Sequence, residues 1–381
     1  MRNGAPIGAV LVDWQMEEMV REGRITGGIR RKDDIQPCSF DLRVGNKMWE
    51  TAGILDLGDG FKTKDFMNYA YNAYDEKALM HGYILTRGAY FVQLDINLKL
   101  GADEWGFVNP KSSSGRIDLH CIALAEGSTS FNTIPHGYHG RVSSLVIPQS
   151  IIVALYKSVA LVQLRIFRGE RAFLSNCELR RLHASHSLID NSDIQPVIED
   201  DHFLIRANLR DNPSNLVVTG TRRPLKLKAK RSVDPRIYFR VKELDSQGAL
   251  WLEPGEFALI GSIEKIRIPH HVCAEMVPFS DRQGEFRSHY AGFFDRGFGY
   301  GRNGEAPGNT VVCEVRNQAS VPIRIAHGQL IARFRFEYLQ YEPDLVYGEG
   351  GQVSHYARQS SGIALAKFFV PWTAPSAPAE L

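Results

Sequence analysis

Two stretches of this chain repeat one another, and that repetition limits the folds open to it. LTRGAYFVQLDINLKLGADEWGFVNPKSSSG, which starts at Leu85, has a counterpart in LEPGEFALIGSIEKIRIPHHVCAEMVPFSDRQG, which starts at Leu252. Two further pairs follow in the same order: IPHGYHGRVSSLVI at Ile134 with FDRGFGYG at Phe294, and LVQLRIF at Leu161 with LIARFRF at Leu330. Individual identities are weak, but their common order indicates tandem copies of one domain.

Strand signals dominate the rest of the sequence. Short runs rich in β-branched and aromatic residues, such as SFDLRVG, YFVQLDINLKL and SLVIPQSIIVALY, are separated by Gly, Pro and Asn. Helical periodicity is rarer: residues 10–22 form an amphipathic pattern that stops at Gly23, and residues 65–82 carry a second such pattern. We therefore expect a mainly β architecture with a few peripheral helices.

The length of the chain and a polar central segment favour two domains. A chain of 381 residues is long for one domain and sufficient for two. Residues 181–203 are polar and loosely patterned, which indicates a linker between halves of similar length. We therefore place the first domain at residues 1–190 and the second domain at residues 191–381.

Charge and cysteine content argue against several classes of protein. The net charge of +2 gives no electrostatic argument for a nucleic-acid or membrane partner, and the basic run KLKAKR alternates like the solvated face of a strand. The N-terminus lacks the features of a secretory signal, and no apolar run approaches the ~20 residues of a membrane span. Five scattered cysteines without a CxxC motif are typical of reduced thiols and argue against structural zinc. We expect a cytoplasmic protein.

The first half contains a candidate anion-binding loop, KSSSGR, which starts at Lys111. Adjacent hydroxyls, including those of Ser112 and Ser113, and backbone N–H groups in a turn can donate to phosphate oxygens. Arg116 adds a permanent two-pronged donor, and Lys111 adds a point charge. A serine-rich surface loop is the alternative that composition leaves open. The second half has FSDRQGEFR at this place, where the charge of Asp281 makes a poor anion site.

The second half contains a different motif, HYAGFFDRGFG from His289, followed by the strand-like NTVVCEVRN. Asp295 lies among aromatic residues in a glycine-bounded hairpin, which can hold a planar base or a sugar; a β-turn capped by Asp is the alternative. Glu314 either faces solvent or is buried with a raised pKa, as suits a general base, and its apolar flanks do not decide between the two. The first half has Pro135 and Leu145 at these positions, so the copies look complementary.

Taken together, these motifs resemble those of the dCTP deaminase branch of the dUTPase-like superfamily. DDIQPCSFDLRVGNKMWE from Asp33 is similar to the family's N-terminal signature, KSSSGR to its phosphate motif, AGFFDRGF to its hairpin, VVCEV to the strand of its catalytic glutamate, and VYGEGGQVSHYARQSSG from Val346 to its closing segment. The likeness is greatest to the long, fused form. It implies two tandem dUTPase-like distorted β-barrel domains of the β-clip or jelly-roll-like kind, in a homo-oligomer with active sites at domain or subunit interfaces.

The resemblance implies metal-independent hydrolysis of dCTP to dUTP and ammonia, without a cofactor, in pyrimidine deoxynucleotide metabolism. Glu314, Ser112 and Arg116 would be catalytic: Glu314 would pass protons from water to N3 and the leaving ammonia, and Ser112 would position that water. Asp295 would take the deoxyribose 3′-hydroxyl, and Ala291 would offer backbone groups to cytosine. The other substrate-binding residues would be Lys111, Ser113, Val312, Tyr347, Tyr356 and Gln359. Mg²⁺ would accompany the triphosphate, and dUTP or dTTP would act as product or inhibitor.

The sequence departs from the family pattern at several positions. Lys111 replaces the usual Arg, Arg296 replaces the hairpin Pro, and His355 stands where the tail usually has Lys. A zinc-dependent cytidine deaminase needs H-x-E and P-C-x-x-C motifs, and the chain has neither. Three alternatives remain open: a bifunctional enzyme that forms dUMP, a dUTPase, and an inactive nucleotide-binding regulatory module.

Overall fold

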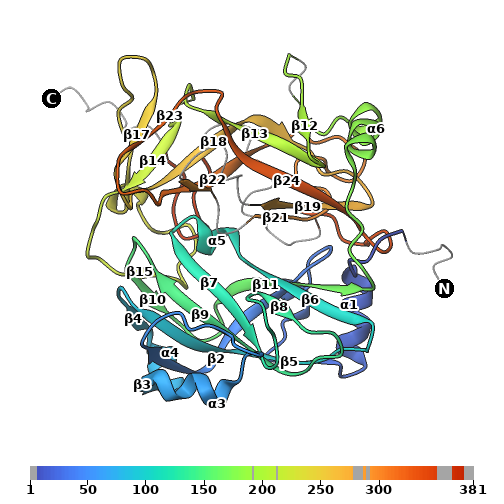
Figure 1. Cartoon of the computed structure of the whole chain (residues 1–381), viewed down its shortest axis with the longest axis vertical. Helices are drawn as coiled ribbons and strands as arrows, with labels where there is room; N and C mark the ends of the chain where they lie inside the picture. The colour runs from blue at the N-terminus through green and yellow to red at the C-terminus, as the bar shows by residue number, and fades with distance from the viewer. Residues whose placement is uncertain are drawn as a thin grey trace.

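The computed structural model describes residues 7–190, 193–211, 213–277, 286–288, 292–349 and 363–372. In this part of the chain two β-sheet bodies lie one above the other: the first body runs from β1 to β11 and the second from β12 to β24 (Figure 1). Helices are few and lie at the edges of the bodies, so the expected mainly β architecture is confirmed. No helix among these residues is long and apolar enough to cross a membrane.

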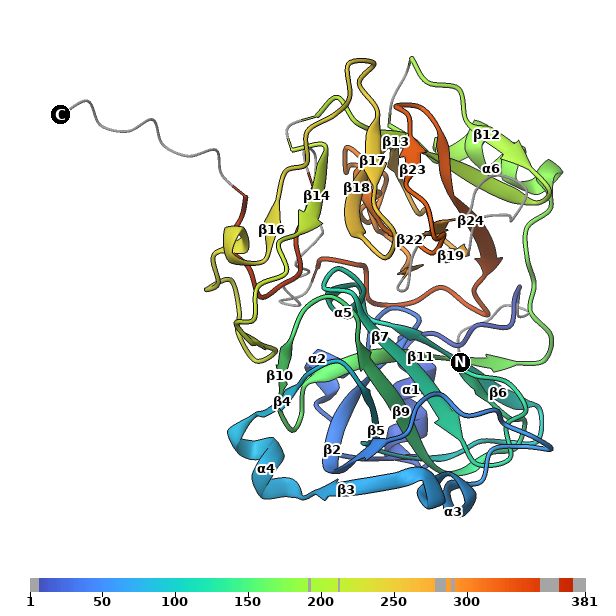
Figure 2. The ribbon, with the colours of Figure 1, turned by 60° about the vertical axis from the view of Figure 1, so that its left-hand side comes forward.

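The first body is a near-closed antiparallel barrel. Its strand order is β7-β9-β5-β2-β11-β6-β8, and β7 also packs beside β6 and β8, which nearly closes the sheet (Figure 2). The strands are β1 (Ile25–Gly27), β2 (Phe40–Thr51), β3 (Ala70–Tyr74), β5 (Ala89–Lys99), β6 (Glu104–Pro110), β7 (Leu119–Ala125), β8 (Thr133–Ile134), β9 (His139–Pro148) and β11 (Ala160–Arg168). A small sheet of β4 (Tyr83–Leu85), β10 (Val153–Leu155) and β15 (Leu225–Lys226) joins the first half to the second.

The second body is a second sheet of similar plan. Its strand order is β16-β14-β18-β13-β24-β19-β21, with β22 paired to β18 and β20. The strands are β12 (Val197–Glu199), β13 (His202–Asn208), β14 (Asn215–Val218), β16 (Phe239–Arg240), β18 (Phe257–Ile266), β19 (Val272–Val277), β20 (Phe286–Ser288), β21 (Phe293–Phe294), β22 (Asn309–Asn317) and β24 (Leu330–Tyr338). β17 (Leu250–Leu252) and β23 (Ile323–Ile325) form a separate pair.

The two bodies share a run of strand neighbours. The order is β9-β5-β2-β11-β6-β8 in the first body and β22-β18-β13-β24-β19-β21 in the second. Leu145 of β9 and Glu314 of β22 occupy the same register position, each two residues from the last pair before a break in its ladder. Ile134 of β8 and Phe294 of β21 also hold equivalent places. The repetition that the sequence suggests therefore extends to pairing register.

The last pair of repeated stretches is shifted by one residue relative to the sequence comparison. The ladder between β11 and β2 skips Leu161, and the ladder between β24 and β13 skips Ile331. Leu161 therefore corresponds to Ile331 and not to Leu330. A bulge leaves one residue unpaired without changing the apolar pattern around it, which is why weak identities misplaced the match.

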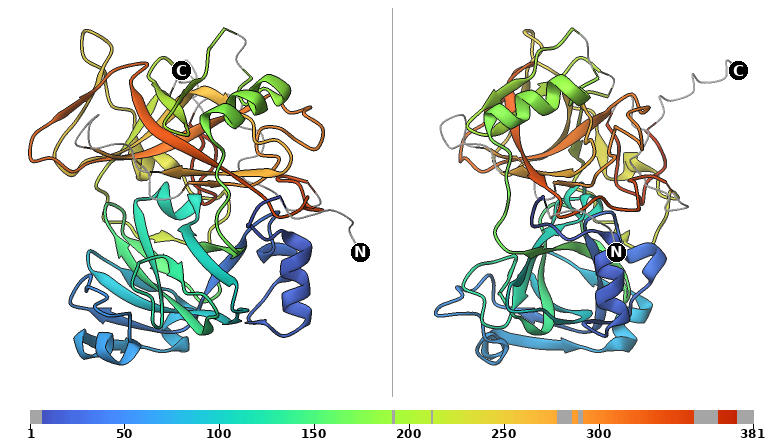
Figure 3. Two further views of the ribbon diagram at one scale, coloured as in Figure 1. Left: turned by 45° about the vertical axis from the view of Figure 1, so that its right-hand side comes forward. Right: turned by 90° about the vertical axis from the view of Figure 1, so that its right-hand side faces the viewer.

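The helix predicted at residues 10–22 is confirmed, and the one predicted at residues 65–82 is wrong. α1 (Asp13–Arg21) lies along the side of the first body (Figure 3). Residues 65–82 do not form one helix, because β3 in their middle pairs with β2. The helical pieces on either side are α3 (Thr63–Phe66), η1 (Met67–Tyr69) and α4 (Glu76–His81). Asp75 starts α4 by accepting the backbone N–H of Ala78 at 3.1 Å.

A helix also occupies the start of the segment expected to be a linker. α6 (Asn176–His186) begins after Ser175, whose hydroxyl accepts the backbone N–H of Glu178 while the Glu178 carboxylate accepts that of Ser175. This capping box is an S-x-x-E helix-start signal that the sequence prediction left unused. α6 lies on the outside of the second body (Figure 3). The remaining short helices are α2 (Arg31–Asp34), α5 (Ser112–Gly115) and η2 (Pro235–Ile237).

The two bodies share part of one hydrophobic core. The larger core cluster consists chiefly of first-body side chains, but it also includes Phe257, Val312 and the C-terminal residues Ile363, Ala366 and Phe368. A second cluster belongs to the second body and α6. Fully burying a side chain such as phenylalanine stabilises a protein by ~1.5–3 kcal/mol, so the shared contacts hold the two bodies together.

Candidate active site

The predicted anion loop lies at the boundary between the two bodies, where α5 points from the first body toward the second (Figure 1, Figure 2). Ser113, Ser114 and Arg116 are buried there. The Ser114 hydroxyl donates to the carbonyl of Leu161 at 3.0 Å, whereas the Ser113 hydroxyl has no hydrogen-bond partner among the described residues. A buried polar group without a partner costs ~1–3 kcal/mol, so the Ser113 hydroxyl is suited to a bound acceptor.

The ammonium of Lys111, just before α5, is already paired. It donates to both carboxylate oxygens of Asp41 on β2, with 2.5 Å to Oδ1. Asp41 is buried, so this ion pair lies away from bulk solvent. Lys111 therefore brings a neutralised pair to the site rather than a full positive charge.

Arg116 connects the anion loop to the second half of the chain. Its guanidinium donates to the carbonyl of Ala364 at 2.8 Å. Burial raises the pKa of the Cys313 thiol on β22, and the charge of Arg116 opposes that rise. Arg116 therefore lies close to the strand that carries Glu314.

Asp295 of the hairpin is buried against the first body. The backbone N–H and the thiol of Cys38 both donate to its Oδ1, at 3.0 Å and 3.2 Å. Burial is the main cause that raises the pKa of Asp295 to about 6; Cys38 and Lys111 act to lower the pKa, and Asp41 acts to raise it. The hairpin of the second body and the anion loop of the first body therefore meet within one chain.

Glu314 lies on the face of β22 that is turned toward the first body. Alternate residues of a strand point to opposite faces. Val312 packs in the core cluster of the first body, and Arg316 forms a 2.5 Å ion pair with Asp118 of the first body. The residues on the other face are Val311, Cys313 and Val315, which pack in the second core cluster. Glu314, between Val312 and Arg316, is 1% exposed. Of the two alternatives that the sequence left open, a solvent-facing or a buried carboxylate, the structure shows the buried one.

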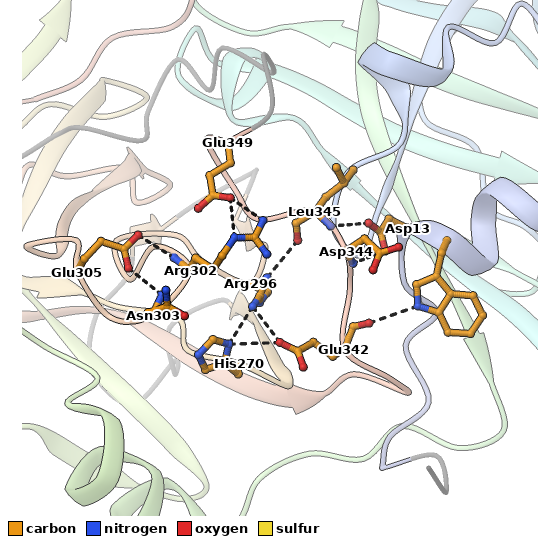
Figure 4. Close-up of polar contacts among 11 residues, drawn as sticks. Asp13, His270, Arg296, Arg302, Asn303, Glu305, Glu342, Asp344, Leu345 and Glu349 are labelled. Atoms are coloured by element: carbon orange, nitrogen blue, oxygen red, sulfur yellow. Dashed lines mark hydrogen bonds and ion pairs between the residues drawn. The ribbon is translucent and has the colours of Figure 1, made fainter. Parts of the chain in front are cut away.

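Arg296, next to Asp295, fastens the hairpin to the chain that follows β24 (Figure 4). Its guanidinium is buried and lies 2.9 Å from Nδ1 of His270 and 3.1 Å from a carboxylate oxygen of Glu342. It also donates to the carbonyl of Leu345 at 3.4 Å. Asp13 of α1 accepts the backbone N–H of Leu345 at 2.6 Å, so both bodies hold this segment.

The segment from Glu342 to Glu349, called the strap here, leads toward the residues expected to close over the nucleotide. The backbone N–H of Tyr347 donates to the carbonyl of Arg296 at 3.2 Å, and the Tyr347 ring lies 5.4 Å from that of Phe298. Tyr347 is therefore placed beside the hairpin. Three other predicted substrate-binding residues lie outside the described residues: Ala291, Tyr356 and Gln359. His355 lies outside them as well.

Two residues of the site were not singled out from the sequence. Cys38 and Asp41 both belong to QPCSFDLRVG, a stretch that predicted a strand and carried part of the family likeness but no site residue. The signal in the sequence was that a cysteine and an aspartate occur close together in one short stretch. The structure shows that both are buried. Their partners, Asp295 and Lys111, are distant in sequence, so only the fold shows the contacts.

A buried ionic network beside the site had no signal in the sequence. Arg165 of β11 is 2.9 Å from a carboxylate oxygen of Glu275 on β19 and 3.4 Å from one of Glu337 on β24. Arg171 also pairs with both carboxylates, at 2.9 Å and 2.6 Å. The Arg165 guanidinium lies over the ring of Phe293, 4.5 Å from its centroid. The network therefore joins the first body to the strands that flank the hairpin.

Comparison with known proteins gives two family models that divide the chain. The model of the 2′-deoxycytidine 5′-triphosphate deaminase N-terminal domain matches residues 8–170, and the model of its C-terminal domain matches residues 175–369. A crystal structure of 2′-deoxycytidine 5′-triphosphate deaminase from Agrobacterium tumefaciens is similar to this chain with a TM-score of 0.80 and 27% identity. The match covers 88% of this chain and 99% of that one.

Curated relatives match a smaller share of the chain. The "dCTP deaminase, dUMP-forming" of Pseudarthrobacter chlorophenolicus is 30% identical over 122 residues, and that of Beutenbergia cavernae is 33% identical over 122 residues. In each case the match covers 32% of this chain and 59% of the relative. With both halves matched by the N- and C-terminal models, the chain belongs to the dCTP deaminase family of enzymes, in its long two-domain form.

Proposed function

We propose that this chain hydrolyses dCTP to dUTP and ammonia, at a site formed where its two halves meet. The observation that supports this most is Glu314, a carboxylate buried on the strand face that is turned toward the first body. We further propose that the two halves, residues 1–190 and 191–381, are tandem dUTPase-like distorted barrels that retain complementary parts of one site. The shared run of strand neighbours supports this reading.

Glu314 would act as the base and then the acid of the reaction. Its carboxylate takes a proton from water, whose oxygen attacks C4 of cytosine. The proton then passes to N3, the second proton of the water passes through Glu314 to the exocyclic nitrogen, and the bond between C4 and that nitrogen breaks to release ammonia. General acid–base assistance of this kind accelerates a reaction by ~10²–10⁴-fold. Ser112 would hold the attacking water.

The other residues would hold the nucleotide. Arg116 and the hydroxyls of Ser112 and Ser113 donate to the phosphates, with Lys111 beside them through its pair with Asp41. Mg²⁺ would arrive with the triphosphate as part of the substrate. The contacts proposed for the nucleoside and the closing segment are those of Asp295, Ala291, Val312, Tyr347, Tyr356 and Gln359. We also propose a homo-oligomer.

A second candidate is a bifunctional enzyme that forms dUMP. The observation that favours it is the printed name of the curated relatives, "dCTP deaminase, dUMP-forming". In this case a second water attacks the α-phosphorus of dUTP and releases pyrophosphate. Incubation with dCTP separates the candidates: ammonia with dUTP supports the deaminase, ammonia with dUMP and pyrophosphate supports the bifunctional enzyme, and no product supports an inactive nucleotide-binding module.

Replacement of Glu314 by Gln tests the role of the buried carboxylate. Glu314→Gln keeps the shape of the side chain but removes the proton acceptor, so dCTP should still bind while ammonia release falls by ~10²-fold or more. Calorimetric binding and an ammonia assay are the two measurements. The control is Glu253→Gln, which changes an exposed glutamate of the same body and should leave both unaltered. Full ammonia release by Glu314→Gln would overturn the assignment.

A further inference from the structure

The described C-terminal segment, residues 363–372, returns to the anion loop. The guanidinium of Arg116 donates to the carbonyl of Ala364 at 2.8 Å. Farther along, the backbone N–H of Arg231 donates to the carbonyl of Lys367 at 2.9 Å. Two buried phenylalanines follow Lys367 directly in the sequence. Hydrogen bonds and burial therefore fix the backbone that carries the Lys367 side chain next to the loop.

Lys367 is partly buried, and its ammonium lies in a group of other cations. The charges that act on it most are those of Lys111, Asp41, Arg43 and Lys230, of which only Asp41 is negative. Burial is the main cause that lowers the pKa of Lys367 to about 8, and the three cations add to it. An anion from outside this group of side chains would stabilise the charged form of such a lysine.

The two carboxylates near this group of cations are each paired with a cation other than Lys367. Lys111 is paired with Asp41, and Arg43 is paired with Asp34 at 2.5 Å. Both carboxylates are buried and already hold a cation each. Two cations of the group remain after these pairs, of which Lys230 is exposed and Lys367 is partly buried.

The same group of charges adjoins the hairpin carboxylate. Asp41 and Lys111 act on the pKa of Asp295 as well as on the pKa of Lys367. The pair of Lys111 and Asp41 therefore lies near both the carboxylate proposed to hold the sugar and the ammonium of Lys367. A nucleotide whose sugar contacts Asp295 would therefore lie beside the same group of charges.

We propose that Lys367 binds the terminal phosphates of the nucleotide and makes the site select a triphosphate over a monophosphate. This inference rests on the proposed function for the identity of the nucleotide. It assigns a specificity role to a residue of the second half that lies beyond the predicted closing segment. A compact ammonium is a suitable point charge for a phosphate oxygen, and such charge-assisted hydrogen bonds are the stronger kind.

Binding of dCTP and dCMP tests the inference without turnover. Calorimetry uses the Glu314→Gln protein with and without Lys367→Met. Loss of a hydrogen bond to a charged group should weaken dCTP binding by ~10–100-fold and leave dCMP binding within about twofold. The control is Lys226→Met, which removes an exposed lysine of β15 and should change neither affinity.

Stability and pH separate a ligand-binding lysine from a structural one. Because the folded state disfavours the charge on Lys367, Lys367→Met should raise the melting temperature of the ligand-free protein near pH 7, by about 2 °C or more. As pH rises through the Lys367 pKa of about 8, dCTP affinity should fall. Lys367→Arg keeps its charge over this range, so it should retain dCTP binding and lose that part of the pH dependence.

Three results would overturn the inference: unchanged dCTP affinity in Lys367→Met, equal losses for dCTP and dCMP, or a lower melting temperature without ligand. The proposed function is judged separately, by ammonia release from the unaltered protein. Selective loss of dCTP binding in a chain that releases no ammonia would leave the Lys367 inference standing and remove the deaminase. Absence of dCTP binding by the Glu314→Gln protein would remove both.

Discussion

At the scale of single residues, Asp295 shows how the chain holds a carboxylate in a buried position. Cys38 donates two hydrogen bonds to one of its oxygens, and both donors come from the other body. These bonds favour the charged form, but burial outweighs them and raises the pKa of Asp295 to about 6. Near neutral pH the carboxylate is therefore charged at the expense of folding stability, and its other oxygen can accept from a sugar hydroxyl.

Replacement of Asp295 by Asn should stabilise the fold and impair the enzyme. A raised pKa means that the folded state binds a proton more readily than the unfolded state. The contribution of Asp295 to folding stability is therefore fully present below pH ~4 and is lost as pH rises through about 6. The charged carboxylate then costs ~3 kcal/mol, which Asn removes while it keeps an acceptor for Cys38. Thermal unfolding near pH 7.5 should show a higher melting temperature, with a gain that shrinks toward pH 4.

The same variant should lower kcat/KM for dCTP, because the amide is a weaker acceptor than the carboxylate. The control is Asp245→Asn, at an aspartate that lies outside the interface and accepts from Trp251 and Arg324 within the second body. It should leave kcat/KM unchanged. A lower melting temperature of Asp295→Asn at pH 7.5 would contradict the pKa argument.

At this scale the sequence predicted four residues that the structure places in buried positions at the boundary of the two bodies: Ser113, Arg116, Asp295 and Glu314. Their role in a site stays a prediction. The partner of Asp295 could not be predicted, because Cys38 is 257 positions away and only the packing of one body on the other brings them together.

At the scale of elements, β22 explains why its sequence could not reveal the orientation of Glu314. One face packs in the core of the second body, and the other packs against the first body. A strand covered on both faces carries apolar residues on both, so the usual alternation disappears. The burial of Glu314 therefore follows from the neighbouring body and not from the strand itself.

Other elements divide according to whether local signals decide them. α1 was predictable because its apolar residues follow helical spacing and stop at a glycine. β3 was not, because Tyr71 and Tyr74 are three residues apart, as on a helix face, and the segment becomes a strand only by pairing with β2. The strand neighbours of the second body followed those of the first, so the repeat carried more information about topology than any single segment.

The hairpin and the strap should act as one element held by Arg296. Arg296→Gln removes the buried cation that contacts the exposed carboxylate of Glu342 and the partly buried ring of His270, so the strap loses charge-assisted hydrogen bonds worth ~1–3 kcal/mol. We expect a lower melting temperature and a higher KM for dCTP, because Tyr347 contacts the hairpin directly. Unfolding and steady-state kinetics measure the two effects.

The loop that follows the hairpin offers a matched control. Arg302 pairs with Glu349 at 2.6 Å, but both side chains are exposed. Such a pair is worth ~0–1 kcal/mol, so Arg302→Gln should change stability and KM little. Equal effects of the two substitutions would show that burial of Arg296 is not what holds the strap.

At the scale of the whole molecule, the two bodies form one unit through contacts across their boundary. The proposed site draws on both, with the anion loop from the first body and Asp295 and Glu314 from the second. Buried charge and apolar contact join them: Arg165 reaches from the first body to Glu275 and Glu337 of the second, and a shared core cluster spans the boundary. The sequence predicted the complementary motifs but not this contact, since no local pattern shows which charged residues will face one another.

The buried network gives the contact between the bodies a pH dependence. Burial acts to raise the pKa of Glu275, but the charges of Arg165 and Arg171 outweigh it and lower that pKa to about 2. A lowered pKa means that Glu275 contributes to folding stability above its unfolded-state pKa of ~4.5. This contribution is lost as pH falls toward 2. Arg165→Met should therefore cost ~3–5 kcal/mol near pH 7 and progressively less as pH falls below 4.

Calorimetric unfolding of Arg165→Met at several pH values tests whether the two bodies depend on one another. Because they share a core as well as the network, the lower melting temperature should apply to a single transition. The control is Arg324→Met, whose partly exposed pair with Asp245 lies within the second body and should shift melting only slightly. Two separate transitions, one of them unmoved by Arg165→Met, would mean that each body folds alone and that the network only aligns them.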